Sequence, residues 1–177
     1  MKRFLAVSAV SAAFLMSAAA HADDVLTGDA KLACEATLCL SSGDRPSECN
    51  ESIKRYFSIK HKRPHKTLQA RKDFLNLCPS SKEEGMPKLV DALVNGAGRC
   101  DAAELNRVMT RTYIKKVRKH RSNKAGGSYT VEVPVRYVRN AKPGYCQAYF
   151  DHEWTTAGDK VQFVGVEKEG GRWVDVK

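Results

Sequence analysis

The sequence predicts an α+β fold in which a disulfide-stapled bundle of about five short helices is followed by a small antiparallel β-sheet. Apolar residues recur every three or four positions through the first two thirds of the chain, which is the spacing of one helix face. After Arg111 they alternate with polar residues, which is the period of a strand. We therefore expect one domain, with a helical part over residues 23–110 and a basic sheet over residues 111–177 that share one core.

The amino terminus has the pattern of an export signal. A basic start, Met1 to Arg3, precedes an apolar run from Phe4 to Ala20, and Ala20-His21-Ala22 matches the small-x-small cleavage rule. We expect a signal peptide over residues 1–22, cleavage near Ala22 and a mature chain of 155 residues. A retained anchor helix is disfavoured because the apolar run is short for crossing a bilayer. The expected location is the periplasm, as a soluble protein.

Five segments are predicted to be helical, at about residues 31–40, 47–59, 67–77, 86–97 and 101–109. The fourth has the clearest amphipathic stripe, from Met86 to Ala97, with Pro87 near its start. Asp101 and Glu104 form a capping-box pattern that opens the fifth.

The strongest strand signal is the alternation of apolar and polar residues from Tyr129 to Tyr137. Pro134 within it indicates an edge strand or a bulge. Further strands are predicted over residues 146–154, 160–166 and 172–176, with turn signals between them, and an earlier one over 113–117. The expected sheet has about four antiparallel strands.

Six cysteines in an exported chain predict a disulfide framework. Cys34 and Cys39 do not suit each other as partners, because five helical residues separate them by about 8 Å along the axis and point them apart. Many pairings remain, and the sequence alone does not select one. The set that we favour is Cys39 with Cys49, Cys34 with Cys78, and Cys100 with Cys146. A zinc site is disfavoured because close Cys-x-x-Cys pairs are missing, and no cofactor is expected.

The charge of the chain is uneven. Residues 23–110 carry 14 Lys/Arg against 13 Asp/Glu, whereas residues 111–177 carry 14 against 7. An acidic partner is therefore expected to bind the carboxy-terminal part. The densest basic run precedes Gly126-Gly127, which places it on the arm and tip of a hairpin. Its candidate contacts for phosphates or carboxylates are Lys115, Lys116, Arg118, Lys119, Arg121 and Lys124. A second, weaker basic cluster covers Lys60 to Lys66.

Four short segments of the first half carry a family resemblance: Leu32-Ala33-Cys34-Glu35-Ala36, Cys39-Leu40-Ser41-Ser42-Gly43, Pro46-Ser47-Glu48-Cys49-Asn50 and Lys54-Arg55-Tyr56-Phe57. Together with Cys78 and Cys100 they resemble the TrbM/KikA family of conjugal-transfer proteins, more loosely across the strands. The resemblance implies a small periplasmic component of a plasmid mating-pair-formation system, the type IV secretion machinery that carries DNA between bacteria. It supplies no catalytic residues.

The expected function is a non-enzymatic interaction role in that machinery, with other secretion-system or envelope proteins as partners. Two alternatives remain. One is a peptidoglycan-acting hydrolase with Glu35 or Glu48 as the acid, if burial raises the pKa of that carboxyl. The other is a module that binds anionic lipid or cell-wall polymer through the basic arm. Nucleic acid is disfavoured because no stacking aromatics are interleaved with the arm's charges. The sequence does not indicate a small-molecule ligand.

Overall fold

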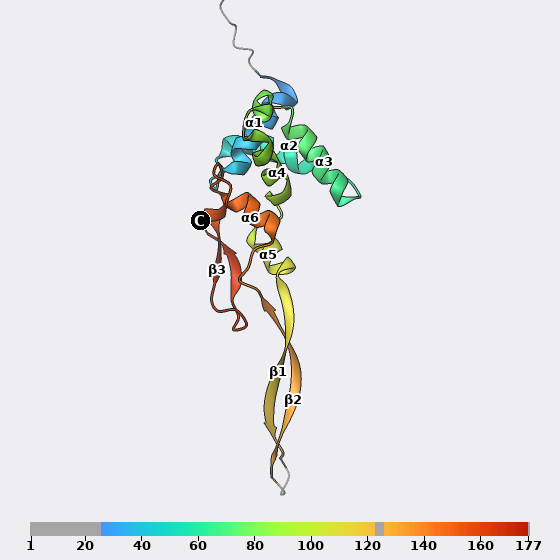
Figure 1. Cartoon of the computed structure of the whole chain (residues 1–177), viewed down its shortest axis with the longest axis vertical. Helices are drawn as coiled ribbons and strands as arrows, with labels where there is room; N and C mark the ends of the chain where they lie inside the picture. The colour runs from blue at the N-terminus through green and yellow to red at the C-terminus, as the bar shows by residue number, and fades with distance from the viewer. Residues whose placement is uncertain (1–25, 123–125, 177) are drawn as a thin grey trace, which may run out of the picture.

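The computed structural model describes residues 26–122 and 126–176, so the predicted signal peptide lies outside the described residues. The helices pack into one body, from which a long two-stranded ribbon projects (Figure 1). None of the helices within the described ranges has both the length and the apolar character needed to cross a membrane.

All five predicted helical segments are confirmed. They form α1 (Gly28–Ser41), α2 (Asn50–Ser58), α3 (Pro64–Leu75), α4 (Met86–Gly96) and α5 (Ala102–Val108), with short 3-10 helices at Ser47–Cys49 and Pro79–Lys82. The capping residue of α5 is Asp101, whose carboxylate accepts the Glu104 backbone N–H at 2.8 Å. α3 begins earlier than predicted, at Pro64, because proline is well suited to the first position of a helix.

The predicted strand over residues 146–154 is wrong: the segment forms a sixth helix, α6 (Gly144–Phe150). Cys146, Tyr149 and Phe150 are its buried residues. They stand at positions i, i+3 and i+4, so a helix places all three on one side, against the core. Pro143 and Gly144 mark the start of this helix. The turn signals between the segments suggested a strand here, but burial of one helical face decides the conformation.

The strands form two separate antiparallel pairs and not one sheet of about four strands. β1 (Thr110–His120) pairs with β2 (Ser128–Val138), and β3 (Val161–Val164) pairs with β4 (Arg172–Asp175). β3 follows a 3-10 helix at Ala157–Lys160. The fold is thus α+β, with six packed helices and two small sheets within the described residues.

The core lies between the helices and takes in part of the carboxy-terminal third. Its fully buried side chains include Leu40, Tyr56, Leu75, Val90, Leu93 and Leu105. Tyr149 on α6 and Trp173 on β4 belong to the same cluster. Asn106 holds β4 against α5, because its side-chain amide donates to the Trp173 carbonyl at 2.9 Å and accepts the Trp173 N–H at 2.8 Å.

Three disulfides connect these elements, and they are the three pairs favoured from the sequence. Cys34–Cys78 joins α1 to the end of α3, and Cys39–Cys49 joins α1 to the 3-10 helix before α2. Cys100–Cys146 joins the segment after α4 to α6. α1 is therefore linked covalently in two directions, and α6 is linked to the helical body.

Replacing Gly96 by alanine is expected to destabilise the protein by about 1–3 kcal/mol, because an added Cβ would overlap the Tyr149 ring where α4 packs on α6. Guanidinium unfolding measures this cost. Gly144→Ala is the matched control, since no atom lies within 4 Å of a Cβ added there. Equal stability of the two variants would contradict the packing described for α4 and α6.

Tyr56 is expected to make the stability depend on alkaline pH. Its side chain is fully buried, and burial raises its pKa from 10.0 to about 12, against the opposing charge of Arg71. The stabilisation is complete below pH 10 and is lost as pH rises toward 12, since the tyrosine ionises more easily in the unfolded chain. The loss amounts to at most about 3 kcal/mol.

The Tyr56→Phe variant isolates this effect. The Tyr56 hydroxyl forms no hydrogen bond within the described residues, so the variant is expected to match the parent at pH 7 within about 0.5 kcal/mol. Chemical unfolding from pH 9 to 12 should show the parent losing stability relative to the variant. Parallel curves over that range would show that Tyr56 does not titrate differently in the folded and unfolded states.

Candidate interaction surface

The ribbon formed by β1 and β2 projects away from the core of the protein (Figure 1). The two strands pair without a break from Thr110↔Val138 to His120↔Ser128, a length of about 35 Å. The Arg139 N–H donates to the Met109 carbonyl at 3.1 Å and closes the base. Among the described residues 110–138 none is buried. The ribbon is therefore an arm on the body, not a wall of its core (Figure 1).

The register gives the ribbon two different faces, since residues directly opposite each other on paired strands point to the same side. One, which we call the apolar face, carries seven aliphatic and aromatic side chains: Tyr113, Val117, Tyr129, Val131, Val133, Val135 and Tyr137. Tyr113 and Tyr137 meet edge to face, with ring centroids 5.5 Å apart. Tyr129 and Val133 remain 43% and 37% exposed. The apolar face is thus held together by its own contacts, and none of its side chains is buried by the body.

Cations border the apolar face along β1. Arg111, Lys115 and Lys119 alternate with Tyr113 and Val117 on the same side of the strand. The Arg121 guanidinium lies 5.9 Å from the centre of the Tyr129 ring, near the tip. At the base, the Lys168 ammonium lies 5.3 and 5.4 Å from the centres of the Tyr113 and Tyr137 rings. The face therefore combines apolar contact area with positive charge.

The structure divides the predicted contact residues between the two faces. Lys115, Lys119 and Arg121 belong to the apolar face. Lys116 and Arg118 lie on the opposite face: Lys116 lies 3.8 Å from the Glu132 carboxylate, and Arg118 Nε donates to Ser128 Oγ at 2.6 Å. Lys124 lies outside the described residues.

Two contributors to the apolar face were not predicted. Arg111 continues the two-residue period of Lys115 and Lys119, so the alternation already contained that signal. Lys168 comes from the turn between β3 and β4 and reaches the ribbon only through the tertiary fold, so no sequence signal identified it.

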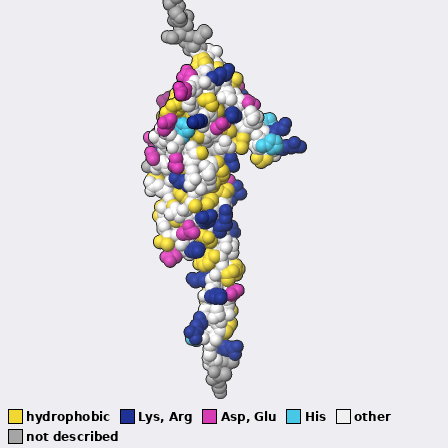
Figure 2. Space-filling view, viewed as in Figure 1, with side chains coloured by type: hydrophobic (Ala, Val, Ile, Leu, Met, Phe, Trp, Pro, Cys, Tyr) yellow, Lys and Arg dark blue, Asp and Glu magenta, His cyan; other side chains and the backbone are white. Residues whose placement is uncertain are grey.

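The excess positive charge of the carboxy-terminal part lies between residues 110 and 138 of the sequence. Residues 110–138 carry 8 Lys/Arg and 1 Glu, whereas residues 139–177 carry 6 Lys/Arg and 6 Asp/Glu. Figure 2 shows Lys and Arg side chains along the projecting ribbon, beside yellow apolar patches. The excess of Lys/Arg predicted for residues 111–177 is thus confined to a shorter segment than expected, because residues 139–177 carry equal numbers of basic and acidic side chains.

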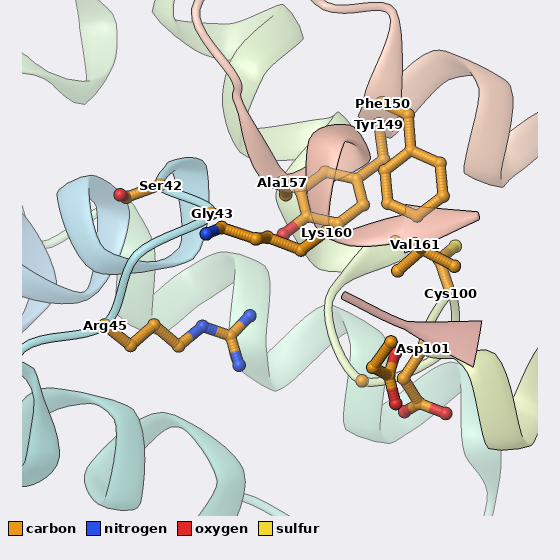
Figure 3. A pocket seen from close by; sticks show the side chains of 13 residues that line it. Ser42, Gly43, Arg45, Cys100, Asp101, Tyr149, Phe150, Ala157, Lys160 and Val161 are labelled. Atoms are coloured by element: carbon orange, nitrogen blue, oxygen red, sulfur yellow. The ribbon is translucent and has the colours of Figure 1, made fainter. Parts of the chain in front are cut away.

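A pocket between α6, the end of α4 and the loop after α1 is the other candidate site (Figure 3). It has a volume of about 230 Å³. Arg45 extends into it from one side and Asp101 lies across from Arg45. Burial raises the pKa of Tyr149 here, while the nearby Arg45 opposes that shift.

Four polar side chains of this pocket have structural partners. Tyr149 donates to the Leu40 carbonyl at 2.6 Å, and Lys160 pairs with Asp44 at 2.8 Å. Asp175 accepts the Ala102 N–H at 3.0 Å, and Asp101 caps α5. These contacts account for the pocket as part of the fold, which leaves the ribbon as the stronger candidate for function.

A TrbM family model matches residues 25–177. The chain belongs to the TrbM family. Membership implies a conjugal transfer protein. Comparisons with curated proteins and with solved structures gave no significant match.

The two glutamates considered for hydrolysis in this TrbM family protein lie on the surface. Glu35 is partly exposed on α1 and lies 3.6 Å from Lys31, one helical turn away. Glu48 is exposed and accepts a hydrogen bond from Ser47 at 3.3 Å. The hydrolase alternative required a buried carboxyl, and neither of these two carboxyls is buried. The structure thus gives this alternative no specific support.

Proposed function

We propose that this TrbM family protein is a periplasmic, non-enzymatic accessory of a plasmid conjugation machinery. In this role it binds an acidic surface on another envelope-exposed subunit through the apolar face of its ribbon. The observation that carries the proposal is the combination of seven apolar side chains with cations on one face of the ribbon, none of them buried.

The periplasmic location is supported by two features. The chain has three disulfides. Disulfides persist in oxidising compartments such as the periplasm and are rare in the cytosol. The first 22 residues have the composition of an export signal.

The binding role is supported by the chemistry of the ribbon. Protein interfaces combine an apolar centre with a charged rim, and tyrosine and arginine are enriched in them. Complementary charge directs the encounter and selects the partner. Eight Lys/Arg against one Glu over residues 110–138 therefore favour a partner with a carboxylate-rich surface.

Neutralising two cations of the apolar face is expected to weaken capture of the partner about tenfold. The test variant is Lys115→Gln with Lys119→Gln, and the matched control is Lys116→Gln with Arg118→Gln, which removes the same charge from the opposite face. Both are used as baits on periplasm from mating-competent cells, and recovery of secretion-system subunits is quantified. Equal loss with both baits would show that only net charge matters, and recovery of no subunit by the parent would contradict the proposed role.

An anionic lipid surface is the second candidate, because apolar side chains bordered by Lys and Arg also suit a membrane interface. Co-sedimentation with vesicles of stated composition separates the two. Binding that rises with the fraction of anionic lipid and falls in the Lys115/Lys119 variant supports lipid. Binding that does not depend on lipid charge would exclude the anionic lipid surface as the partner.

A further inference from the structure

A second concentration of positive charge lies away from the ribbon, where α2 leads into α3. Residues 54–72 include 8 Lys/Arg and no Asp or Glu. The turn before α3 projects from the body, and Figure 2 shows Lys, Arg and His side chains gathered there. Positive side chains at the amino terminus of α3 are unfavourable next to the helix dipole, since the amino terminus of a helix attracts negative charge. The first turn of α3 holds no acidic residue, and no side chain caps it.

Arg71 differs from the other basic residues of this region because it is buried. Its side chain comes from α3 and is only 8% exposed, with the guanidinium 4.9 and 5.0 Å from the centres of the Tyr56 and Phe57 rings. Among the described residues Arg71 has no carboxylate within salt-bridge distance, and its Nε forms no hydrogen bond. A buried charge without a counter-ion is costly. An anion beside it would compensate that cost.

A pocket of about 370 Å³ brings Arg71 together with three further basic side chains, Lys60, His61 and Arg99. Arg99 comes from the segment after α4 and is partly buried. Its guanidinium lies 4.2 Å from the centre of the Tyr145 ring and donates to the Asn95 carbonyl at 3.0 Å. Glu104, whose pKa is lowered by Arg107 and more weakly by Arg99, is already paired with Arg107 through two hydrogen bonds.

The backbone around the pocket is fixed. The His61 N–H donates to Thr67 Oγ1 at 2.9 Å, which holds the basic turn against α3. Gly98, at φ +72, leaves room for the Phe57 ring, because an added Cβ would lie 2.6 Å from it. Pro64 and Leu68 supply an apolar wall. Arg71 and Arg99 line the pocket from the body of the protein, and Lys60 and His61 line it from the exposed turn before α3.

We propose that this pocket, between the turn after α2, α3 and the segment after α4, binds a phosphate group, either free or as a phosphomonoester. Several cations favour a dianion over a single carboxylate. The apolar wall of Pro64 and Leu68 would contact the stem of a phosphomonoester. The site is independent of the apolar face of the ribbon, so either proposal can fail alone.

The binding test is a titration of the disulfide-bonded mature chain with inorganic phosphate, at constant ionic strength set by chloride. Backbone amide NMR signals of residues 60–63, 65–67 and 98–99 are expected to shift saturably, with acetate binding at least fivefold more weakly. Shifts that do not saturate, or that acetate reproduces at the same concentration, would overturn the proposal.

Variants at the rim keep the test independent of folding. Lys60→Gln and Arg99→Gln are each expected to weaken phosphate binding about fivefold to tenfold. Lys54→Gln is the matched control, because it removes the same charge from α2 without lining the pocket. If Lys54→Gln weakens binding as much as Lys60→Gln, the effect is general electrostatics and the site is refuted. Arg71→Lys, which keeps the charge but loses the planar fork, should weaken binding more than either rim variant.

The source of the phosphate is decided by a competition. Vesicles with phosphatidic acid present a phosphomonoester on a lipid. Binding that inorganic phosphate displaces in the parent, and that is weakened in Lys60→Gln, assigns the pocket to a headgroup. Saturable binding of inorganic phosphate with no displaceable vesicle binding assigns it to a soluble phosphate.

Discussion

Replacing Cys34 and Cys78 by alanine is expected to lower the free energy of unfolding by about 4 kcal/mol, and replacing Cys100 and Cys146 by a similar amount. Replacing Cys39 and Cys49 should cost less, about 3 kcal/mol. The order follows from loop length: the first and third disulfides join residues 44 and 46 positions apart, and the second joins residues 10 apart. A longer loop restricts the unfolded chain more. Guanidinium unfolding of the three double variants measures the three costs.

The packing of the sulfurs reinforces this order. Cys78, Cys100 and Cys146 are at most 3% exposed and belong to the core cluster, so alanine leaves small cavities there. Cys39 is 9% exposed. A loss of about 4 kcal/mol is a large share of the 5–15 kcal/mol that stabilises most domains. If the Cys39/Cys49 variant is the least stable of the three, chain entropy is not the main contribution. If all three unfold like the parent, the helices hold together without the cross-links.

The helical half of the fold was predictable because its signals are local. Pro87 and the Asp101–Glu104 pattern mark helix starts, and Met86 to Ala97 carries one continuous apolar stripe. Helix geometry also excluded Cys34 with Cys39 from the sequence alone. The α6 helix was missed because seven residues hold about two turns, too few for a helical period to be recognised in the sequence.

The candidate surface was only half predictable. A period of two from Tyr129 to Tyr137 identifies a strand and its apolar side, but it does not say whether another layer covers that side. How much of that side is covered depends on tertiary structure: β3 and β4 form a second sheet, and Lys168 of the turn between them reaches the base of the apolar face. The pocket around Arg71 was beyond sequence reasoning, because Arg99 lies 28 positions away and nothing local indicates that Arg71 is buried without a counter-ion.

Excising the ribbon is expected to abolish conjugal transfer while leaving the body folded. The variant replaces residues 112–136 by Asn-Gly, a two-residue turn that suits a tight hairpin between Arg111 and Tyr137, which are paired in the ribbon. Its stability should stay within about 1 kcal/mol of the parent, because no described residue between 112 and 136 is buried. Transfer frequency should fall to that of a strain lacking the gene. Chemical unfolding and mating assays, with the amount of protein in the periplasm quantified, measure both.

The controls separate loss of the ribbon from loss of the protein. Gly96→Ala destabilises the body through Tyr149 and leaves the ribbon intact, so any fall in transfer should follow its abundance. The excised variant should differ by staying abundant and inactive. Full transfer by the excised variant would refute the proposed role of the apolar face, since Tyr113, Val117, Lys115 and Lys119 are all removed with the ribbon. An unstable excised variant would instead show that the ribbon contributes to folding through contacts that burial does not reveal. The role of the apolar face in transfer and the stability of the body without the ribbon can therefore be tested separately with this one variant.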